Sequence, residues 1–493
     1  VIDSMKDTSV ILGLDVGTTC CKCMAFDAGL NLLAESSVEY GLVHGGDGRV
    51  EQDPDVWWGA ALETIRRTAA LSMKHGPVRG IGVSSQGISF VPVDLDGNHL
   101  MNAMTWLDMR SAEQCDDLKR SIDEKDIFKK TGKRINPAYS LPKMIWLKDN
   151  LPGIYKKTFK FLTAHDYIIG RLCKNFVTED SLAAGTMAYD INEKRWDPEI
   201  LGYAGISVEK LPDIKRSGSG AGYLDKEVAA NTGLFEDVLV STGGQDQKCA
   251  ALGAGLSYDC ITVSIGTSCA ITALFDAPVF PSDMSLPCFP YIDGKSWVLE
   301  GFGSTAGVSL KWFRDNAGKH SYREIDEGIR ALYDSDRIPD NVLFFPYLGG
   351  TASPEWYDAK GGGFLGITLD TGNFNMAAAV LEGVAFTIKS NILKMESLGR
   401  TFSEISIFGG GAKSDVWLKL IADITGKQVR KAYLEESACL GAAMMCMKAM
   451  GVSDIKLPSK ERFIKPNPDK TVLYEKKYQR YRELADRIYG GEL

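Results

Sequence analysis

The chain has 493 residues, more than the ~250–300 at which a single hydrophobic core stops growing, so we expect two large domains. Its 44% hydrophobic and 24% charged residues are ordinary for a globular protein, and its formal charge of −8 argues against nucleic acid or an anionic membrane as partner. The sequence lacks an apolar run of the ~18–20 residues that cross a bilayer and a signal-peptide pattern in residues 1–10. Together with 11 cysteines, this predicts reduced thiols and a cytoplasmic location.

The first elements in chain order are strands. Apolar runs over residues 9–19, 20–26 and 32–40 are separated by short turns, which predicts an antiparallel meander. Asp53 and Pro54 suit the N-cap and first position of a helix over residues 53–71. Residues 78–94 then predict a strand, a glycine-bearing turn and another strand.

The second half of the chain repeats the plan of the first. The segment "VSIGTSCAITALF" matches the earlier "LDVGTTCCKCMAF": an apolar strand, a small Gly-Thr turn and a second apolar strand. We therefore place the domains at residues 1–254 and 255–493, and predict an α/β fold with a cleft between two related halves. Further helices are expected at 137–150, 164–172, 178–184 and 374–397, and over the last ~40 residues.

The two Gly-Thr turns have the composition of phosphate-binding loops. Backbone N–H groups and hydroxyls bind anions well, and glycine lets the backbone approach closely. The first turn offers Gly17, Thr18, Thr19 and Lys22, and the second offers Gly266, Thr267 and Ser268. A lone turn of this kind is equally an ordinary hairpin, but two at matching places favour a phosphate clamp. The chain has neither a P-loop motif nor a convincing dinucleotide-binding fingerprint.

Two acidic residues end apolar strands. Asp15 could hold Mg²⁺, in part through water, and Asp246 could accept a hydroxyl proton during phosphoryl transfer. The alternative role for Asp246 is a helix N-cap. A third glycine cluster, "FGGGAKSD" at 408–415, is either a nucleoside pocket or a tight strand–helix connection.

Two turns of the first domain carry polar groups suited to a sugar. Gln86, Asp108 and Arg110 offer hydrogen bonds, and Trp106 offers an apolar platform for the C–H face of a sugar ring. Taken singly, Trp106 also fits a core position and Arg110 a surface ion pair.

The three cysteines at 20, 21 and 23 first suggest a metal clip. A Cys20–Cys23 pair would need further ligands, and no second Cys-x-x-Cys exists in the sequence to provide them. Cys21 and Cys23 share one face of the predicted strand, which favours packing behind the phosphate-binding turn.

At this point the motifs coincide in order with those of a known family. The chain resembles the FGGY carbohydrate kinases, of the actin-like, ribonuclease H-like ATPase superfamily, from about Val10 to about Met450. The matching segments are "DVGTTCCK", "EQDPDVWW", "TWLDMR", "LPKMIWLKDN", "GGQDQ", "SIGTS", "GGGFLGITLDTGNFNMAAAVLEG", "FGGGAKSD" and "ESACLGAA".

The resemblance implies two actin-like domains closing over ATP–Mg²⁺ and a sugar or polyol, with Asp246 as general base and Asp15 and Asp246 near the metal. The residues it implies for ATP binding are Gly17, Thr18, Thr19, Lys22, Gly266, Thr267, Gly307, Lys311, Gly410, Gly411, Ala412 and Asp415. Those it implies for the sugar pocket are Gln86, Trp106, Asp108, Arg110 and Gln247. A homodimer is left open as the oligomeric state.

The turn after Gln86 bears on the substrate. Glycerol kinases carry Gln-Arg-Glu where this chain has Gln86-Gly87-Ile88, which disfavours glycerol. Xylulokinases carry Gln-Met-His-Gly there, so the Gln is kept and the His is lost. "TWLDMR" and "GGQDQ" are more similar to the xylulokinase branch, so a ketopentose such as xylulose is favoured. Other ketoses, tetritols, pentitols and, less so, gluconate or glycerol stay open, as does an actin- or chaperone-type ATPase without a sugar substrate.

Overall fold

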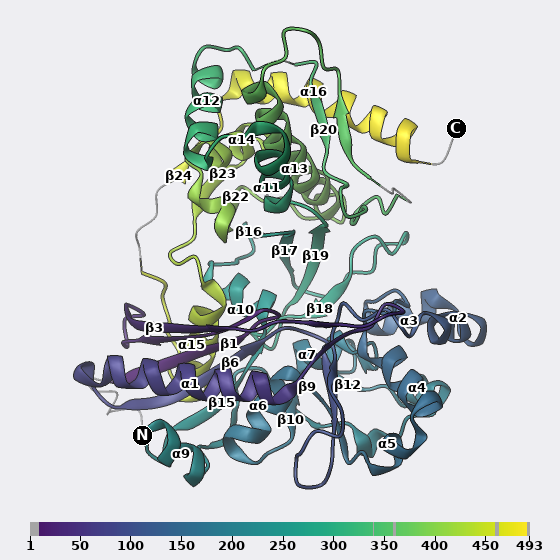
Figure 1. Ribbon diagram of the computed structural model, residues 1–493, viewed down its shortest axis with the longest axis vertical. Helices are drawn as coiled ribbons and strands as arrows, with labels where there is room; N and C mark the ends of the chain where they lie inside the picture. Colours follow the sequence, from purple (N-terminus) through teal and green to yellow (C-terminus); the bar gives the residue numbers. More distant parts are fainter. Residues whose placement is uncertain (1–8, 339, 358–360, 459–462, 491–493) are drawn as a thin grey trace.

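A computed structural model describes residues 9–338, 340–357, 361–458 and 463–490 of the chain. Figure 1 shows two lobes stacked along the longest axis, the lower one built around the N-terminal strands and the upper one largely from the second half of the chain. The first eight residues, which bear on the signal-peptide prediction, lie outside the described residues.

The lower lobe is organised around one mixed six-stranded sheet in the order β14-β15-β6-β1-β2-β3. Strands β1, β2 and β3 pair antiparallel, which confirms the predicted meander. Strand β6 pairs parallel with β1, and β15 pairs parallel with β6. The strands are β1 (Val10–Val16), β2 (Cys20–Phe26), β3 (Leu32–Glu39), β6 (Val78–Ser85), β14 (Gly220–Tyr223) and β15 (Leu239–Gln245).

The upper lobe repeats this sheet. Its order is β18-β19-β17-β16-β22-β23-β24, in which β16 pairs antiparallel with β17 and parallel with β22, as β1 does with β2 and β6. The predicted internal repeat is therefore confirmed in the topology. The strands are β16 (Cys260–Ile265), β17 (Cys269–Phe275), β18 (Cys288–Pro290), β19 (Trp297–Gly303), β22 (Glu404–Phe408), β23 (Gln428–Lys431) and β24 (Phe463–Ile464).

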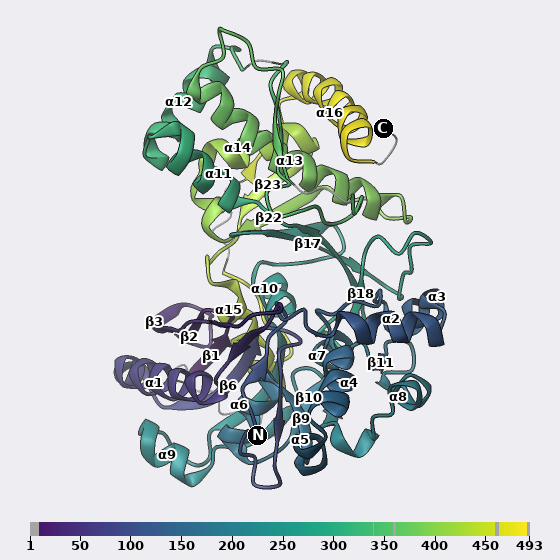
Figure 2. The same cartoon turned by 45° about the vertical axis from the view of Figure 1, so that its right-hand side comes forward.

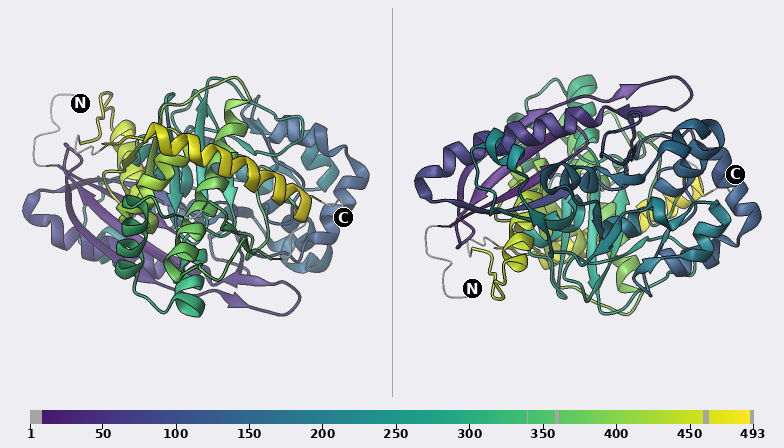
Figure 3. Two further views of the ribbon diagram at one scale, coloured as in Figure 1. Left: turned by 90° about the horizontal axis from the view of Figure 1, so that it is seen from above. Right: turned by 90° about the horizontal axis from the view of Figure 1, so that it is seen from below.

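Helices cover both sheets (Figures 2 and 3). Asp53 caps the first of them by accepting a hydrogen bond from the Asp55 N–H (2.9 Å), as the Asp-Pro start predicts. The long helices are α1 (Pro54–Ser72), α4 (Ser140–Asn150), α6 (Ala164–Cys173), α12 (Tyr322–Asp334), α13 (Asn373–Glu396), α14 (Asp415–Thr425), α15 (Ser437–Ala449) and α16 (Pro468–Tyr489). The remaining helices are α2 (Ala112–Ser121), α3 (Glu124–Thr131), α5 (Pro152–Lys157), α7 (Asp180–Gly185), α8 (Pro198–Ala204), α9 (Lys226–Thr232), α10 (Asp246–Gly253) and α11 (Gly307–Phe313).

Small sheets and short helical turns complete the described fold. A five-stranded sheet in the order β4-β5-β8-β7-β9 flanks the main sheet of the lower lobe. The remaining strands are β4 (Val43–His44), β5 (Val50–Gln52), β7 (Phe90–Val93), β8 (Ala103–Met104), β9 (Lys160–Thr163), β10 (Val177–Glu179), β11 (Tyr189–Asp190), β12 (Arg195–Trp196), β13 (Asp213–Lys215), β20 (Leu343–Phe345) and β21 (Gly363–Leu365). The short turns are η1 (Met73–His75), η2 (Val208–Lys210), η3 (Arg314–Gly318) and η4 (Gly410–Lys413).

Helix α13 is long and apolar enough to cross a membrane by length and composition. Most of its apolar stretch is buried in the structure, and it contributes residues such as Val384 and Phe386 to the core of the upper lobe. Its apolar character is thus accounted for by packing within the protein.

Helix α15 comes late in the chain but packs on the sheet of the lower lobe (Figures 1 and 2). The contact is close enough to require glycine on the strands. A Cβ on Gly13 would overlap the carbonyl of Cys439, and one on Gly82 would overlap the carbonyl of Ala442. Residues of the second half of the sequence therefore help to build the core beneath β1 and β6.

The cysteines lie in this packing. Cys21 and Cys23 are buried with Trp57 and Ile65 of α1, while Cys439 and Cys446 of α15 are buried against Ile11 and its neighbours. All eleven cysteines are free thiols, and all but Cys20 are buried. The interpretation of Cys21 and Cys23 as strand packing is confirmed.

The close approach of α15 predicts an asymmetry between two glycines. We expect Gly82→Ala to lower the free energy of unfolding by about 1–3 kcal/mol, because the added methyl must displace the backbone of α15. Gly59→Ala is the matched control on the exposed face of α1, where no atom of the described residues lies within 4 Å of the new Cβ. This variant should stabilise the protein by about 0.5–1 kcal/mol. Equal effects of the two variants in urea unfolding would contradict the packing described.

Candidate active site

Two carboxyl groups meet at the ends of adjacent parallel strands. The register pairs Asp15 of β1 with Ser84 of β6, and Ser84 with Gly244 of β15. Asp246 begins α10 two residues after Gly244. Because the three strands run in one direction, their carboxyl ends bring Asp15 and Asp246 to the same edge of the sheet, the usual site of ligand binding in such sheets.

The surroundings of the two carboxyls favour their protonated forms. Burial raises the pKa of Asp15 to about 6, although the Ser84 hydroxyl opposes this by donating a hydrogen bond to Oδ1 (2.7 Å). Burial and the nearby charge of Asp15 raise the pKa of Asp246 to about 7. The backbone N–H of Gln247 donates to Asp246 Oδ1 (2.7 Å) and limits that rise. Asp246 is thus poised to exchange a proton near neutral pH.

The carbonyl groups of the first Gly-Thr turn accept hydrogen bonds from the protein, which fixes the backbone of the turn. The Tyr40 hydroxyl donates to the Gly17 carbonyl (2.7 Å), and Gln52 Nε2 donates to the Thr18 carbonyl (2.6 Å). The Thr19 carbonyl accepts from the backbone N–H of Tyr40 (2.9 Å). Within the described chain the backbone N–H groups of Thr18 and Thr19 donate to no other residue, which leaves them available to an anion.

The second turn has the same construction. The backbone N–H groups of Ala306 and Gly307, at the start of α11, donate to the carbonyls of Thr267 (2.9 Å) and Gly266 (2.8 Å). Gly266 and Thr267 are exposed. The sequence-predicted Gly307 therefore acts on this turn from behind, by fixing its backbone.

The third glycine cluster packs on the second turn. Gly410, Gly411 and Ala412 lie in η4, after β22, and Asp415 opens α14. A Cβ on Gly411 would overlap the side chain of Ile265, which directly precedes the second turn. The structure thus brings "FGGGAKSD" and "SIGTS" together.

Both lysines predicted to bind ATP have carboxylate partners. Lys22 pairs with Glu436, the residue before α15, and Lys311 pairs with Asp315 one helical turn away (2.9 Å). Binding a phosphate would require either ammonium group to leave or share its partner, so these two roles stay predictions.

The predicted sugar-binding residue Gln86 lies behind the surface. It is 1% exposed, its Nε2 donates to Gln52 Oε1 (3.1 Å), and its Oε1 accepts from the Ser89 hydroxyl (3.0 Å). Ser89 Oγ in turn accepts from the backbone N–H of Trp106 (3.1 Å). Direct contact of Gln86 with a sugar stays a prediction; in this arrangement it positions the turn.

Asp108 and Arg110 form a mostly buried ionic network. Arg110 Nε donates to both Asp108 oxygens (2.9 and 3.0 Å), and its Nη2 reaches Glu51 (2.5 Å). The guanidinium also stacks over the Trp146 ring at 5.0 Å. Arg110 is therefore in an ion pair, one of the two roles weighed from the sequence, but the pair is buried.

Trp106 connects the two predicted halves of the site. Its side chain is partly exposed, as a sugar platform requires, and its indole Nε1 donates to the Thr18 hydroxyl (3.1 Å). By contrast, the carboxamide of the predicted Gln247 makes no hydrogen bond within the described residues.

Several residues of this site have no role in the sequence analysis. Ser84 orients Asp15, Gln52 links the first turn to Gln86, and Glu436 holds Lys22. Gln52 and Glu436 fall inside the matched segments "EQDPDVWW" and "ESACLGAA", which is the one signal that could have identified them.

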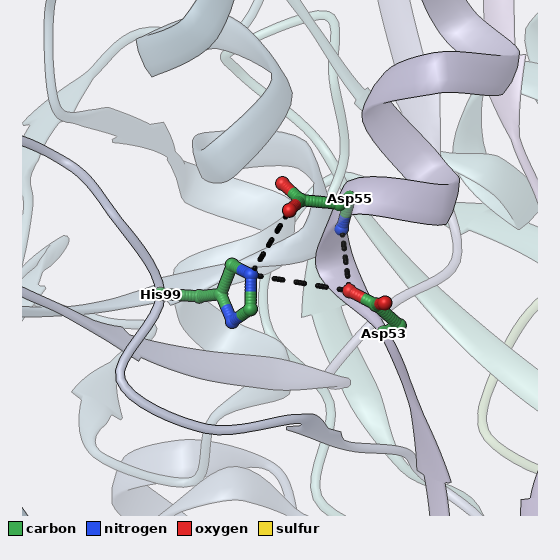
Figure 4. A group of neighbouring side chains, drawn as sticks. All are labelled: Asp53, Asp55 and His99. Carbon is green, nitrogen blue, oxygen red and sulfur yellow. Dashed lines mark hydrogen bonds and ion pairs between the residues drawn. The ribbon is translucent and has the colours of Figure 1, made fainter.

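A separate group of metal-ligand type lies at the start of α1 (Figure 4). His99 Nε2 is 3.3 Å from an Asp55 oxygen and 3.9 Å from an Asp53 oxygen. Asp53 already caps α1, and Arg171 lies 3.7 Å from Asp55. These contacts account for the group as a helix cap with its ion pairs.

The N-terminal domain of the FGGY family of carbohydrate kinases matches residues 10–253, and the C-terminal domain of that family matches residues 261–450. The chain belongs to the FGGY family of carbohydrate kinases, and the predicted fold class is confirmed.

Relatives with different substrates match over nearly the whole chain. A xylulose kinase of Bacillus subtilis (strain 168) is 31% identical over 481 residues, covering 97% of this chain and 95% of that protein. A glycerol kinase of Thermococcus onnurineus (strain NA1) is 32% identical over 495 residues, covering 97% and 98%. The crystal structure of a gluconate kinase from Lactobacillus acidophilus has a TM-score of 0.90 at 27% identity, covering 98% and 99%. The chain is a sugar kinase, and ATP is the substrate that kinase membership implies.

Proposed function

We propose that this protein transfers a phosphoryl group from ATP to a hydroxyl of a ketopentose such as xylulose. The observation that carries the proposal is the Asp246 carboxyl group. It has a pKa of about 7, and it lies near Asp15, the residue that precedes the first Gly-Thr turn. A general base works best when its pKa is near the operating pH. ATP as co-substrate supports a cytoplasmic location.

Asp246 accepts the proton of the reacting hydroxyl as the phosphoryl group is transferred. Thr18 and Thr19 bind phosphate oxygens through their free backbone N–H groups, and Thr267 does so from the other lobe. Phosphoryl transfer has a loose transition state, so positioning and neutralisation of charge contribute more than the strength of the base. Gln247 binds the sugar, Trp106 packs on its C–H face, and the η4 turn holds the nucleoside.

The carboxylates suit a magnesium ion. Mg²⁺ prefers oxygen ligands and keeps several waters, and Asp15 and Asp246 offer such oxygens at a place where the charge of Asp15 raises the pKa of Asp246. When bound, Mg²⁺ supplies neutralisation of the charge on the transferring phosphates.

Among sugars, the turn 86–89 favours a ketopentose over glycerol. It lacks the Arg and Glu of glycerol kinases, and Ile88 stands where xylulokinases have His. Ile88 has φ of +61°, a conformation that β-branched residues rarely adopt, so the turn holds an apolar side chain at some conformational cost. Another ketose or a linear polyol is the second candidate, since the polar contact of a His is replaced by an apolar one.

The substrate is tested by ADP release in the presence of single sugars. The panel comprises D- and L-ketopentoses, ketohexoses, tetritols, pentitols, glycerol and gluconate, with the sugar-free enzyme as baseline. We expect the highest kcat/KM with a ketopentose. A higher value for glycerol or gluconate would overturn the substrate proposal, and ATP hydrolysis indifferent to every sugar would overturn the assignment of a sugar as acceptor.

The role of Asp246 is tested by Asp246→Asn. We expect sugar phosphorylation to fall by about 10²–10⁴-fold with ATP binding retained, because the amide cannot accept the proton. In the wild type, kcat/KM should fall as pH drops below about 7, because Asp246 becomes protonated. Asp96→Asn, in an exposed turn, is the matched control and should behave as wild type. Unchanged turnover in Asp246→Asn would exclude Asp246 as the base.

A further inference from the structure

Gln245 presents a carboxamide that the protein does not use. It is the last residue of β15, directly before Asp246. Its Oε1 is buried without a hydrogen-bond partner, and neither end of its carboxamide bonds to another described residue. Buried polar atoms are nearly always paired in native proteins, so an unpaired one beside a catalytic centre indicates a partner that the chain itself does not supply.

The side chain of Gln245 lies over the turn proposed to face the sugar. A Cβ built on Gly87 would come within 2.6 Å of Gln245 Nε2 and 3.0 Å of its Cγ. Gly87 thus leaves the space that the carboxamide occupies, and any larger residue there would displace it.

The backbone of Gln245 is fixed from the opposite direction. Its N–H donates to the Ser181 hydroxyl (3.1 Å), which donates in turn to Glu179 Oε1 (2.5 Å). Glu179 is fully buried and also accepts from the backbone N–H of Leu182 (2.7 Å). With its backbone held in this way, Gln245 keeps its carboxamide in a defined place.

The polar side chains of the neighbouring turn 84–89 are already hydrogen-bonded within the protein. Gln86 and Ser89 bond to each other, Ser84 donates to Asp15, and Ser85 donates to the Gln86 carbonyl (2.9 Å). Ile88 adds an apolar group. The Gln245 carboxamide, which packs against this turn, is therefore a polar group that remains available to hydrogen-bond a ligand.

We infer that Gln245 is a specificity-determining residue: its Oε1 accepts a hydrogen bond from one sugar hydroxyl other than the one that is phosphorylated. The inference rests on the proposed sugar kinase activity and adds a contact that the sequence motifs do not assign. A site built to hydrogen-bond a hydroxyl rejects an analogue that lacks it, because the buried acceptor is then left unpaired.

The test compares Gln245→Met with wild type on the preferred sugar of the ADP-release panel and on its monodeoxy analogues. Methionine keeps the length and volume but removes the acceptor. We expect the wild type to disfavour one analogue by about 10–100-fold in kcat/KM. In Gln245→Met, the ratio of kcat/KM for the parent sugar to kcat/KM for that one analogue should fall to near unity. The same ratios for the other analogues, and the KM for ATP, should stay unchanged.

Gln114→Met is the matched control. Gln114 lies on α2 and also has a buried Oε1 without a partner among the described residues, but it is not adjacent to the turn 86–89 in the sequence or to Asp246. Gln114→Met should keep every ratio of the wild type. Gly87→Ala gives a second route, since its methyl displaces the Gln245 carboxamide and should remove the same single ratio.

The inference is overturned if both Gln245→Met and Gly87→Ala still disfavour the same monodeoxy analogue as the wild type does. It is also overturned if kcat/KM falls equally for the parent sugar and all analogues, because that result indicates a structural role. If Gln245→Met does not fold, Gly87→Ala decides alone by the same criterion. Failure of the proposed function is distinguishable, because the wild-type enzyme would then show no sugar-dependent ADP release before any variant is compared.

Discussion

The arrangement of this site depends on the electrostatic repulsion that the charge of Asp15 exerts on the Asp246 carboxylate. Strand register fixes both carboxyls at one edge of the parallel strands β1, β6 and β15. There, burial raises the pKa of each, and the charge of Asp15 adds to the rise for Asp246. An arrangement of this kind is unfavourable in the ligand-free protein and suits a cation and a proton-donating hydroxyl. In the proposed function, the cation and the substrate hydroxyl would offset this energetic cost on binding.

Much of the surrounding structure holds these two groups in position. Helix α15 supports β1 and β6 at glycines that leave no space for a side chain, and Glu436 beside it pairs with Lys22. On the other side, Glu179 and Ser181 fix the backbone just before Asp246. The second half of the sequence thus supports the strand that carries Asp15, which explains why a domain boundary drawn by residue number does not describe the packing.

Local patterns were sufficient to predict the first strands and the repeat, and they single out the two acidic residues that the structure brings to one edge of the sheet. Apolar runs and turn residues predict β1 to β3, and the echo at 260–275 predicts a second strand–turn–strand unit. The structure shows that this unit belongs to a second sheet of corresponding order. What could not be predicted is which polar residues are committed to one another. Gln86, Asp108 and Arg110 offer hydrogen bonds in the sequence, but their partners Gln52 and Glu51 become known only when distant segments are brought together. Gln245 was overlooked for the converse reason, because a free acceptor is visible only after all other contacts are assigned.

The central claim is that the charge of Asp15 helps to keep the Asp246 carboxyl protonated to near neutral pH. The most direct measurement is the pKa of Asp246 from the chemical shift of its side-chain carboxyl carbon, in the ligand-free protein and in Asp15→Asn. The wild type should titrate at about 7, and the variant at a clearly lower pH because one negative charge is removed. An ordinary aspartate pKa in the wild type, or the same value in both proteins, would contradict the account.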